Sequence, residues 1–346
     1  MTGFTQRYLA IRLISTLIAV TIVIANLWLW NIDPGEIETI SPSYIFRALI
    51  YGMQTFFFSY LGFLLAENVS RFYWNRWRVK KSRKNNIISE YITINTSNGQ
   101  KIQGYLHSSL GGNETDIIIL SHGINDTQQS TNYFTRAFVL AGFKVFTWTY
   151  RGIEGRKGKI TDFTGHILDL KNVIGYWHKG LGNIRRSRIL LCGWSLGGMV
   201  SLIAGFTDHR VQKIYAWSTW SNLKKNILWK IYINPFAFFR YFIRKQLMFI
   251  TREQNKAVSP ALFFEKVKRE LNSHEFNKLV GDRVFLSHTR DDKLVSYKNF
   301  LENVEALELP SKQTHLFNKG SHLMIRNEPV LLGHALSFFR KEVDDD

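Results

Sequence analysis

The sequence feature that most constrains the fold is an apolar run that ends at a serine between glycines. Residues 188–200 read RILLCGWSLGGMV, with Ser195 between Gly193 and Gly197. The apolar run predicts a buried strand, and the small and apolar residues after the serine predict a helix. A side chain at such a sharp strand-to-helix turn is held in a strained backbone conformation, and glycine neighbours leave room for it. The pattern also occurs by chance, so a nucleophilic role for Ser195 needs support from elsewhere in the chain.

Short apolar runs alternate with amphipathic stretches from residue 90 onward. Strands are predicted at 91–95, 101–106, 117–120, 144–150, 188–194, 213–219 and 283–288, with a last one around 306–310. Helices are predicted near 129–141, 164–179, 197–206, 296–306 and 328–341. A hairpin followed by repeated strand–helix units predicts an α/β fold, with a mostly parallel sheet and helices on both faces.

Two uncharged apolar segments precede this α/β region. Residues 13–30 are eighteen residues without a charge and end in tryptophans, and residues 48–66 are nineteen uncharged residues. Both are long enough to cross a bilayer, so the sequence predicts a transmembrane hairpin within residues 1–70. Two alternatives stay open. In the first, residues 13–30 are a cleaved signal peptide, which the flanking residues disfavour. In the second, residues 48–66 are a buried core helix of the α/β domain.

Basic residues are concentrated after the second apolar segment. The chain has a formal net charge of +18, and residues 71–84, RFYWNRWRVKKSRK, hold seven basic residues and no acidic one. Because lysine and arginine favour the cytoplasmic side, we expect an integral protein of the cell membrane with its N-terminus and residues 88–346 in the cytoplasm. The juxtamembrane segment 71–87 would then contact the anionic membrane surface. No nucleic-acid-binding module is recognisable, so nucleic acid is not expected as a partner.

Residues 223–256 break the alternation of strands and helices. They contain eight aromatic and eight basic residues against one acidic residue, and no uncharged run is long enough to span a bilayer. We interpret them as part of a cap inserted into the α/β domain over about 222–282. A pair of amphipathic helices packed on the domain fits the pattern equally well.

Two later motifs supply an acid and a base. RVFLSHTRDDKLV places Asp291 and Asp292 after a strand, and FNKGSHLMI places His322 in a loop before the last helix. Ligand sites in open α/β sheets lie beyond the carboxyl ends of strands, so either aspartate can reach the histidine. Together with Ser195 they give the chain order serine, aspartate, histidine.

GWSLGG, HTRDDKLV and GSHLMI, together with SHG at 121–123, resemble the motifs of the α/β-hydrolase superfamily. The resemblance covers about residues 88–342. It is closest to the branch with serine aminopeptidase-like, monoacylglycerol-lipase-like and membrane-tethered acyl-thioesterase members. It implies that Ser195 is the nucleophile, His322 the general base and Asp292 the orienting acid. Asp292 is preferred over Asp291 because the family places the acid three residues before a valine, here Val295.

The resemblance also implies an oxyanion hole, formed by the backbone N–H groups of Ile124 and Leu196. It implies no cofactor and no metal. One loop departs from the family pattern: TYRGIEGRKGK has Thr149 and Lys157 where relatives have an acidic and a hydroxylated residue. That difference concerns the subfamily rather than the triad.

These features together predict a membrane-anchored serine hydrolase that cleaves an ester or thioester through an acyl-enzyme intermediate. A basic, aromatic cap favours an acyl substrate of lipidic character. Two alternatives stay open: a peptidase of the same fold, and a non-catalytic membrane scaffold that binds lipid or a protein partner. The oligomeric state is left open by the sequence.

Overall fold

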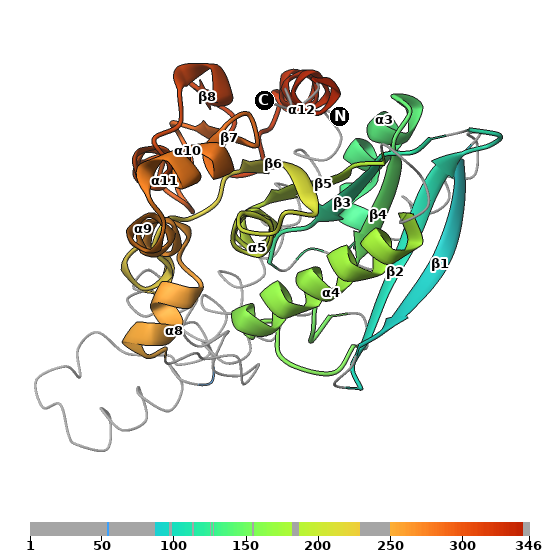
Figure 1. The fold of residues 1–346 in the computed structure, drawn as a ribbon, viewed down its shortest axis with the longest axis horizontal. Helices are drawn as coiled ribbons and strands as arrows, with labels where there is room; N and C mark the ends of the chain where they lie inside the picture. The colour runs from blue at the N-terminus through green and yellow to red at the C-terminus, as the bar shows by residue number, and fades with distance from the viewer. Residues whose placement is uncertain are drawn as a thin grey trace, which may run out of the picture. The chain divides into compact units, whose positions relative to one another are not determined.

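The computed structural model describes residue 54 and residues 87–96, 99–112, 114–124, 126, 128–153, 156–181, 187–228 and 250–341. The chain divides into two units, residues 1–84 and 85–346, and the second contains every strand and helix given below (Figure 1). Apart from Gln54, the two predicted membrane spans and the basic segment lie outside the described residues. Among the described helices, none combines the length and the apolar character that a bilayer crossing requires.

The core of the second unit is an eight-stranded sheet in the order β1-β2-β4-β3-β5-β6-β7-β8. β1 and β2 form an antiparallel hairpin, β2 pairs antiparallel with β4, and all later pairs are parallel. The prediction of a mostly parallel α/β sheet is therefore confirmed. The strands are β1 (Ile87–Asn95), β2 (Lys101–Ser109), β3 (Ile117–Ser121), β4 (Lys144–Trp148), β5 (Ile189–Trp194), β6 (Val211–Trp217), β7 (Val284–Thr289) and β8 (Thr314–Phe317).

Helices cover both faces of this sheet, because the central strands are apolar on both sides. On β5, Ile189 and Leu191 pack into one apolar core with α4, α5, α9 and α11, whereas Leu190 and Cys192 pack into a second core with α3 and α12. Figure 1 shows α4 and α5 on the near face of the sheet. The α-helices are α3 (Asn132–Leu140), α4 (Phe163–Leu181), α5 (Leu196–Gly205), α8 (Arg252–Ala257), α9 (Pro260–Glu270), α10 (Ser273–Val280), α11 (Lys298–Leu307) and α12 (Glu328–Arg340).

The last strand lies later in the chain than predicted. The prediction of a strand around 306–310 is wrong, because Leu307 is buried as the last residue of α11 and Glu308 then ends that helix in the left-handed conformation, at φ 53°. Pro310 introduces a short 3-10 turn, Ser311–Gln313, and only then does the chain enter β8.

Much of the predicted cap region packs into the domain itself. Phe264 of α9 and Phe276 of α10 are fully buried in the same core as α5, so residues 260–280 form the helical crossover between β6 and β7. A hydrogen bond joins the segment before residues 229–249 to the segment after them, since the Leu223 N–H donates to Ser259 Oγ at 2.9 Å. The cap stays a prediction for residues 229–249, which lie outside the described residues.

Candidate active site

Ser195 lies at the sharp turn between β5 and α5. Its backbone has φ 53° and ψ −118°, a conformation that non-glycine residues rarely adopt. The Ser195 N–H donates to the Trp217 carbonyl at 3.0 Å, and the Ser195 carbonyl accepts from Thr219 Oγ1 at 2.9 Å. A Cβ at Gly197 would lie 2.1 Å from the carbonyl oxygen of Ser121, so β3 can approach the turn only because this residue is glycine. The strained turn predicted from the sequence is present.

Asp292 and His322 are in direct contact. His322 Nδ1 lies 2.8 Å from Asp292 Oδ2, and Asp292 Oδ1 accepts the backbone N–H groups of Leu294 and Val295, each at 2.9 Å. Burial by itself would raise the pKa of the Asp292 carboxyl. Hydrogen bonds from His288, His322 and the Val295 N–H outweigh it, and they hold the pKa well below its usual range. Asp292 is therefore ionised and both of its oxygens are occupied.

Ser195 and the Asp292–His322 pair lie at the same edge of the sheet, beyond the carboxyl ends of strands. Ser195 follows β5, Asp292 follows β7 and His322 follows β8. The pairs β5–β6, β6–β7 and β7–β8 are all parallel, so the carboxyl ends of these strands point the same way. Among the described residues, no hydrogen bond joins Ser195 Oγ to His322 Nε2. Catalytic hydrogen bonds are often long before substrate binds, so the geometry remains compatible with a base at His322.

His288 is a second histidine beside Asp292 that the sequence analysis did not single out. It is buried in β7, its Nε2 donates to the Val295 carbonyl at 2.8 Å, and the same atom lies 3.4 Å from Asp292 Oδ2. A histidine within a predicted strand, four residues before the acid, is the signal that could have identified it. Its contacts fix both the carboxylate and the turn that follows.

The two predicted oxyanion donors lie near the same turn. Leu196 is the first residue of α5, so its N–H is one of those that a helix leaves without an intrahelical acceptor. Ile124 lies in the loop after β3, the strand that pairs with β5. That loop is fixed to the turn because Trp194 Nε1 donates to Asp126 Oδ2 at 3.3 Å.

His122 lies in the same loop and is fully buried, and the protein itself surrounds its ring. Its Nδ1 donates to the Gly123 carbonyl at 2.8 Å, and its ring packs against Tyr150 with the centroids 4.3 Å apart. Burial lowers its pKa to about 4. His122 is therefore neutral at pH 7, and its contacts fit a loop-shaping residue rather than the base for Ser195.

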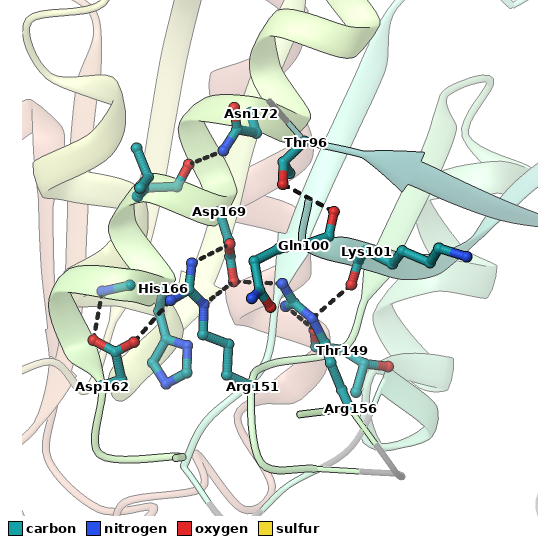
Figure 2. A network of polar contacts seen from close by, with 12 residues as sticks. Thr96, Gln100, Lys101, Thr149, Arg151, Arg156, Asp162, His166, Asp169 and Asn172 are labelled. Carbon is teal, nitrogen blue, oxygen red and sulfur yellow. Dashed lines mark hydrogen bonds and ion pairs between the residues drawn. The ribbon is translucent and has the colours of Figure 1, made fainter. Parts of the chain in front are cut away.

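The loop that departs from the family pattern is held by a buried ionic network (Figure 2). Arg151 binds Asp169 of α4 through two hydrogen bonds of 2.7 and 2.8 Å, and Arg156 contacts the same carboxylate at 2.7 Å. Arg156 also donates to the carbonyl oxygens of Lys101 and Thr149, at 2.9 and 2.8 Å. The loop after β4 is thereby fixed to β2 and α4.

In the described part of the chain, no group of three or more histidine, cysteine, aspartate or glutamate side chains is arranged so that it could hold a metal ion. His166 of α4 donates through Nε2 to the Ile160 carbonyl at 2.8 Å. Cys192 is a buried free thiol, and burial raises its pKa.

Comparison with known proteins agrees with this architecture. Residues 112–263 match the family model described as serine aminopeptidase, S33. The comparison with curated protein sequences returned no match.

Among solved structures, an esterase from Pyrococcus furiosus is similar, with a TM-score of 0.53 and 16% identity, over 73% of this chain and 91% of that one. The 2,6-dihydroxy-pseudo-oxynicotine hydrolase gives a TM-score of 0.51 at 16% identity, over 72% and 67% of the two chains. A sugar hydrolase from Lactococcus lactis gives 0.50 at 15% identity, over 72% and 96%. The unit that begins at Asn85 has the α/β-hydrolase fold.

Proposed function

We propose that this chain is a membrane-anchored serine hydrolase that cleaves an ester or thioester bond in a lipidic or acylated substrate. The observation that carries the proposal is the 2.8 Å hydrogen bond between His322 Nδ1 and the ionised Asp292, at the sheet edge where Ser195 occupies a strained turn. An imidazole whose Nδ1–H is held by a carboxylate presents Nε2 as the basic atom, which is what an acyl-transfer serine requires.

In the proposed mechanism Ser195 Oγ attacks the acyl carbonyl while His322 Nε2 takes its proton. The oxyanion accepts hydrogen bonds from the N–H groups of Ile124 and Leu196, each worth about 3 kcal/mol of transition-state stabilisation. His322 then donates its proton to the leaving group, which leaves an acyl-enzyme on Ser195. Water, activated by His322, attacks that acyl group and releases the acid.

The substrate class and the membrane anchor rest on the sequence. The two uncharged segments, the basic segment 71–84 and the basic, aromatic residues 223–256 favour an acyl chain presented at an anionic membrane surface. The match to a serine aminopeptidase model keeps a peptidase of the same fold as the second candidate. A peptidase for free amino termini needs acidic groups for the substrate ammonium, and the basic character of residues 223–256 disfavours it.

Labelling with a fluorophosphonate probe tests the proposal. Full-length protein in detergent should be labelled, and it should hydrolyse p-nitrophenyl esters. Ser195→Ala and His322→Ala should lose labelling and lower ester hydrolysis by at least about 10³-fold, because each removes a member of the triad. The matched control is Ser201→Ala: Ser201 lies on α5, buried, and its hydroxyl lacks a hydrogen-bond partner in the described structure. The control should keep both activities, whereas hydrolysis that survives Ser195→Ala would contradict the mechanism.

A further inference from the structure

The backbone on both sides of His322 is strained. Gly320 has φ 146°, Ser321 has φ 54°, and Met324 and Arg326 have φ 55° and 69°. Three of these four residues carry a side chain, and each such conformation costs on the order of 1–3 kcal/mol. Strain of this kind persists only where surrounding contacts hold it, so the contacts of residues 320 and 321 are informative.

Those contacts come from the last residue of β7 and from the second residue after it. Asp291 Oδ1 accepts the Ser321 N–H at 2.8 Å, and Asp291 Oδ2 accepts the Gly320 N–H at 3.2 Å. Thr289 Oγ1 donates to the Ser321 carbonyl at 2.9 Å. Both polar groups of the Ser321 backbone are therefore bound by the segment that also carries Asp292.

The two adjacent aspartates bind different parts of the histidine segment. Asp292 contacts the His322 ring, whereas both oxygens of Asp291 are used on the main chain immediately before it. An ionised carboxylate that accepts two N–H groups makes stronger hydrogen bonds than a neutral acceptor. Burial by itself would raise the pKa of the Asp291 carboxyl, but the hydrogen bonds from the Ser321 and Gly320 N–H groups outweigh it and hold the pKa below its usual range.

We propose that Asp291 is a positioning residue for His322: its carboxylate fixes the strained Gly320–Ser321 backbone so that the imidazole reaches both Asp292 and Ser195. This inference rests on the proposed function, because it assigns Asp291 a role only through the base. Asp291 is not an alternative orienting acid, since its carboxylate binds backbone N–H groups and not the imidazole. Asparagine at this position keeps one acceptor oxygen and so retains part of the interaction.

A double-mutant cycle tests the proposal on full-length protein in detergent, with p-nitrophenyl ester hydrolysis as the readout. Misplacing a catalytic group by about 1 Å costs on the order of 10²-fold. Asp291→Ala should therefore lower kcat by roughly 10- to 100-fold with little change in KM. The kcat of Asp291→Asn should lie between those of the wild type and Asp291→Ala. In a His322→Ala background, Asp291→Ala should cause no further loss, because the group through which it acts is already absent.

The control is Glu275→Ala, which removes another exposed carboxylate that accepts a backbone N–H, that of Asn272 at the start of α10. This control should leave kcat unchanged. The inference is wrong if Asp291→Ala matches the wild type, or if it lowers activity equally with and without His322, as a general structural role would. Asp291→Asn gives the same comparison if the alanine variant does not fold. Absence of any Ser195-dependent hydrolysis in the wild type would overturn the proposed function and this inference with it. Failure of the cycle alone leaves the proposed function standing.

Discussion

Two buried histidines give this fold a stability that depends on pH. His122 and His166 both pack against Tyr150, with ring centroids 4.3 and 4.7 Å from it. Burial lowers the pKa of each from 6.5 to about 4. Between these two pH values the unfolded chain binds a proton at each site and the folded protein does not. Stability is therefore lost as the pH falls from about 6.5 to about 4.

We expect each of these histidines to contribute about 2 kcal/mol to the loss of stability between pH 7 and pH 5. His166→Gln should reduce that loss, because glutamine does not titrate and can still donate to the Ile160 carbonyl that His166 binds. The measurement is chemical unfolding of both proteins at the two pH values. The contributions of all other titrating groups are the same in the two proteins and cancel. Equal losses of stability in His166→Gln and the wild type would therefore contradict the lowered pKa of His166.

At the scale of elements, Asp169 joins three of them. It is fully buried on α4, and its carboxylate binds Arg151 and Arg156 from the loop after β4. Arg156 also donates to the Lys101 carbonyl of β2. Removing one partner of a buried ion pair leaves an uncompensated charge in the interior, which costs several kcal/mol.

Asp169→Asn should therefore destabilise the protein by about 3–5 kcal/mol. The matched control is Asp162→Asn: Asp162 binds the same Arg151 at 2.8 Å, but its side chain is 41% exposed. Exposed ion pairs contribute about 1 kcal/mol or less, so this variant should be close to the wild type. Denaturant unfolding of the two variants distinguishes the sites, and similar losses would mean that burial does not set the strength of this network.

At the scale of the whole molecule, the charge distribution predicts an orientation in the membrane. Arg7 and Arg12 precede the first apolar segment, seven basic residues follow the second, and the loop between contains Asp33, Glu36 and Glu38. Fused after Asp346, a reporter that works in the cytoplasm should therefore be active, and one that works only outside the cytoplasm should be inactive. The same fusion with residues 1–84 deleted should be released into the soluble fraction. A C-terminal reporter that works only outside the cytoplasm would overturn the orientation.

The sequence determined much of the fold because strands buried on both faces are continuous apolar runs, and such runs are visible without the structure. IIIL and RILLCGW became β3 and β5, and the turn at Ser195 could be predicted because glycine spacing and sharp turns are local properties. The last strand could not be placed, since residues 306–310 are apolar enough for a strand. Whether they pair or complete a helix depends on the burial of Leu307 against residues far away in the chain.

The candidate triad was named from short motifs, because each motif keeps its residues close together in the sequence. What Asp291 and Asp292 each do was decided only by the tertiary structure. Adjacent aspartates are equivalent in a sequence, but the chain direction after β7 turns one toward the His322 ring and the other toward the backbone of Gly320 and Ser321. The same holds for the arginine pair on Asp169: its partner lies on another element, and only folding brings those charges together.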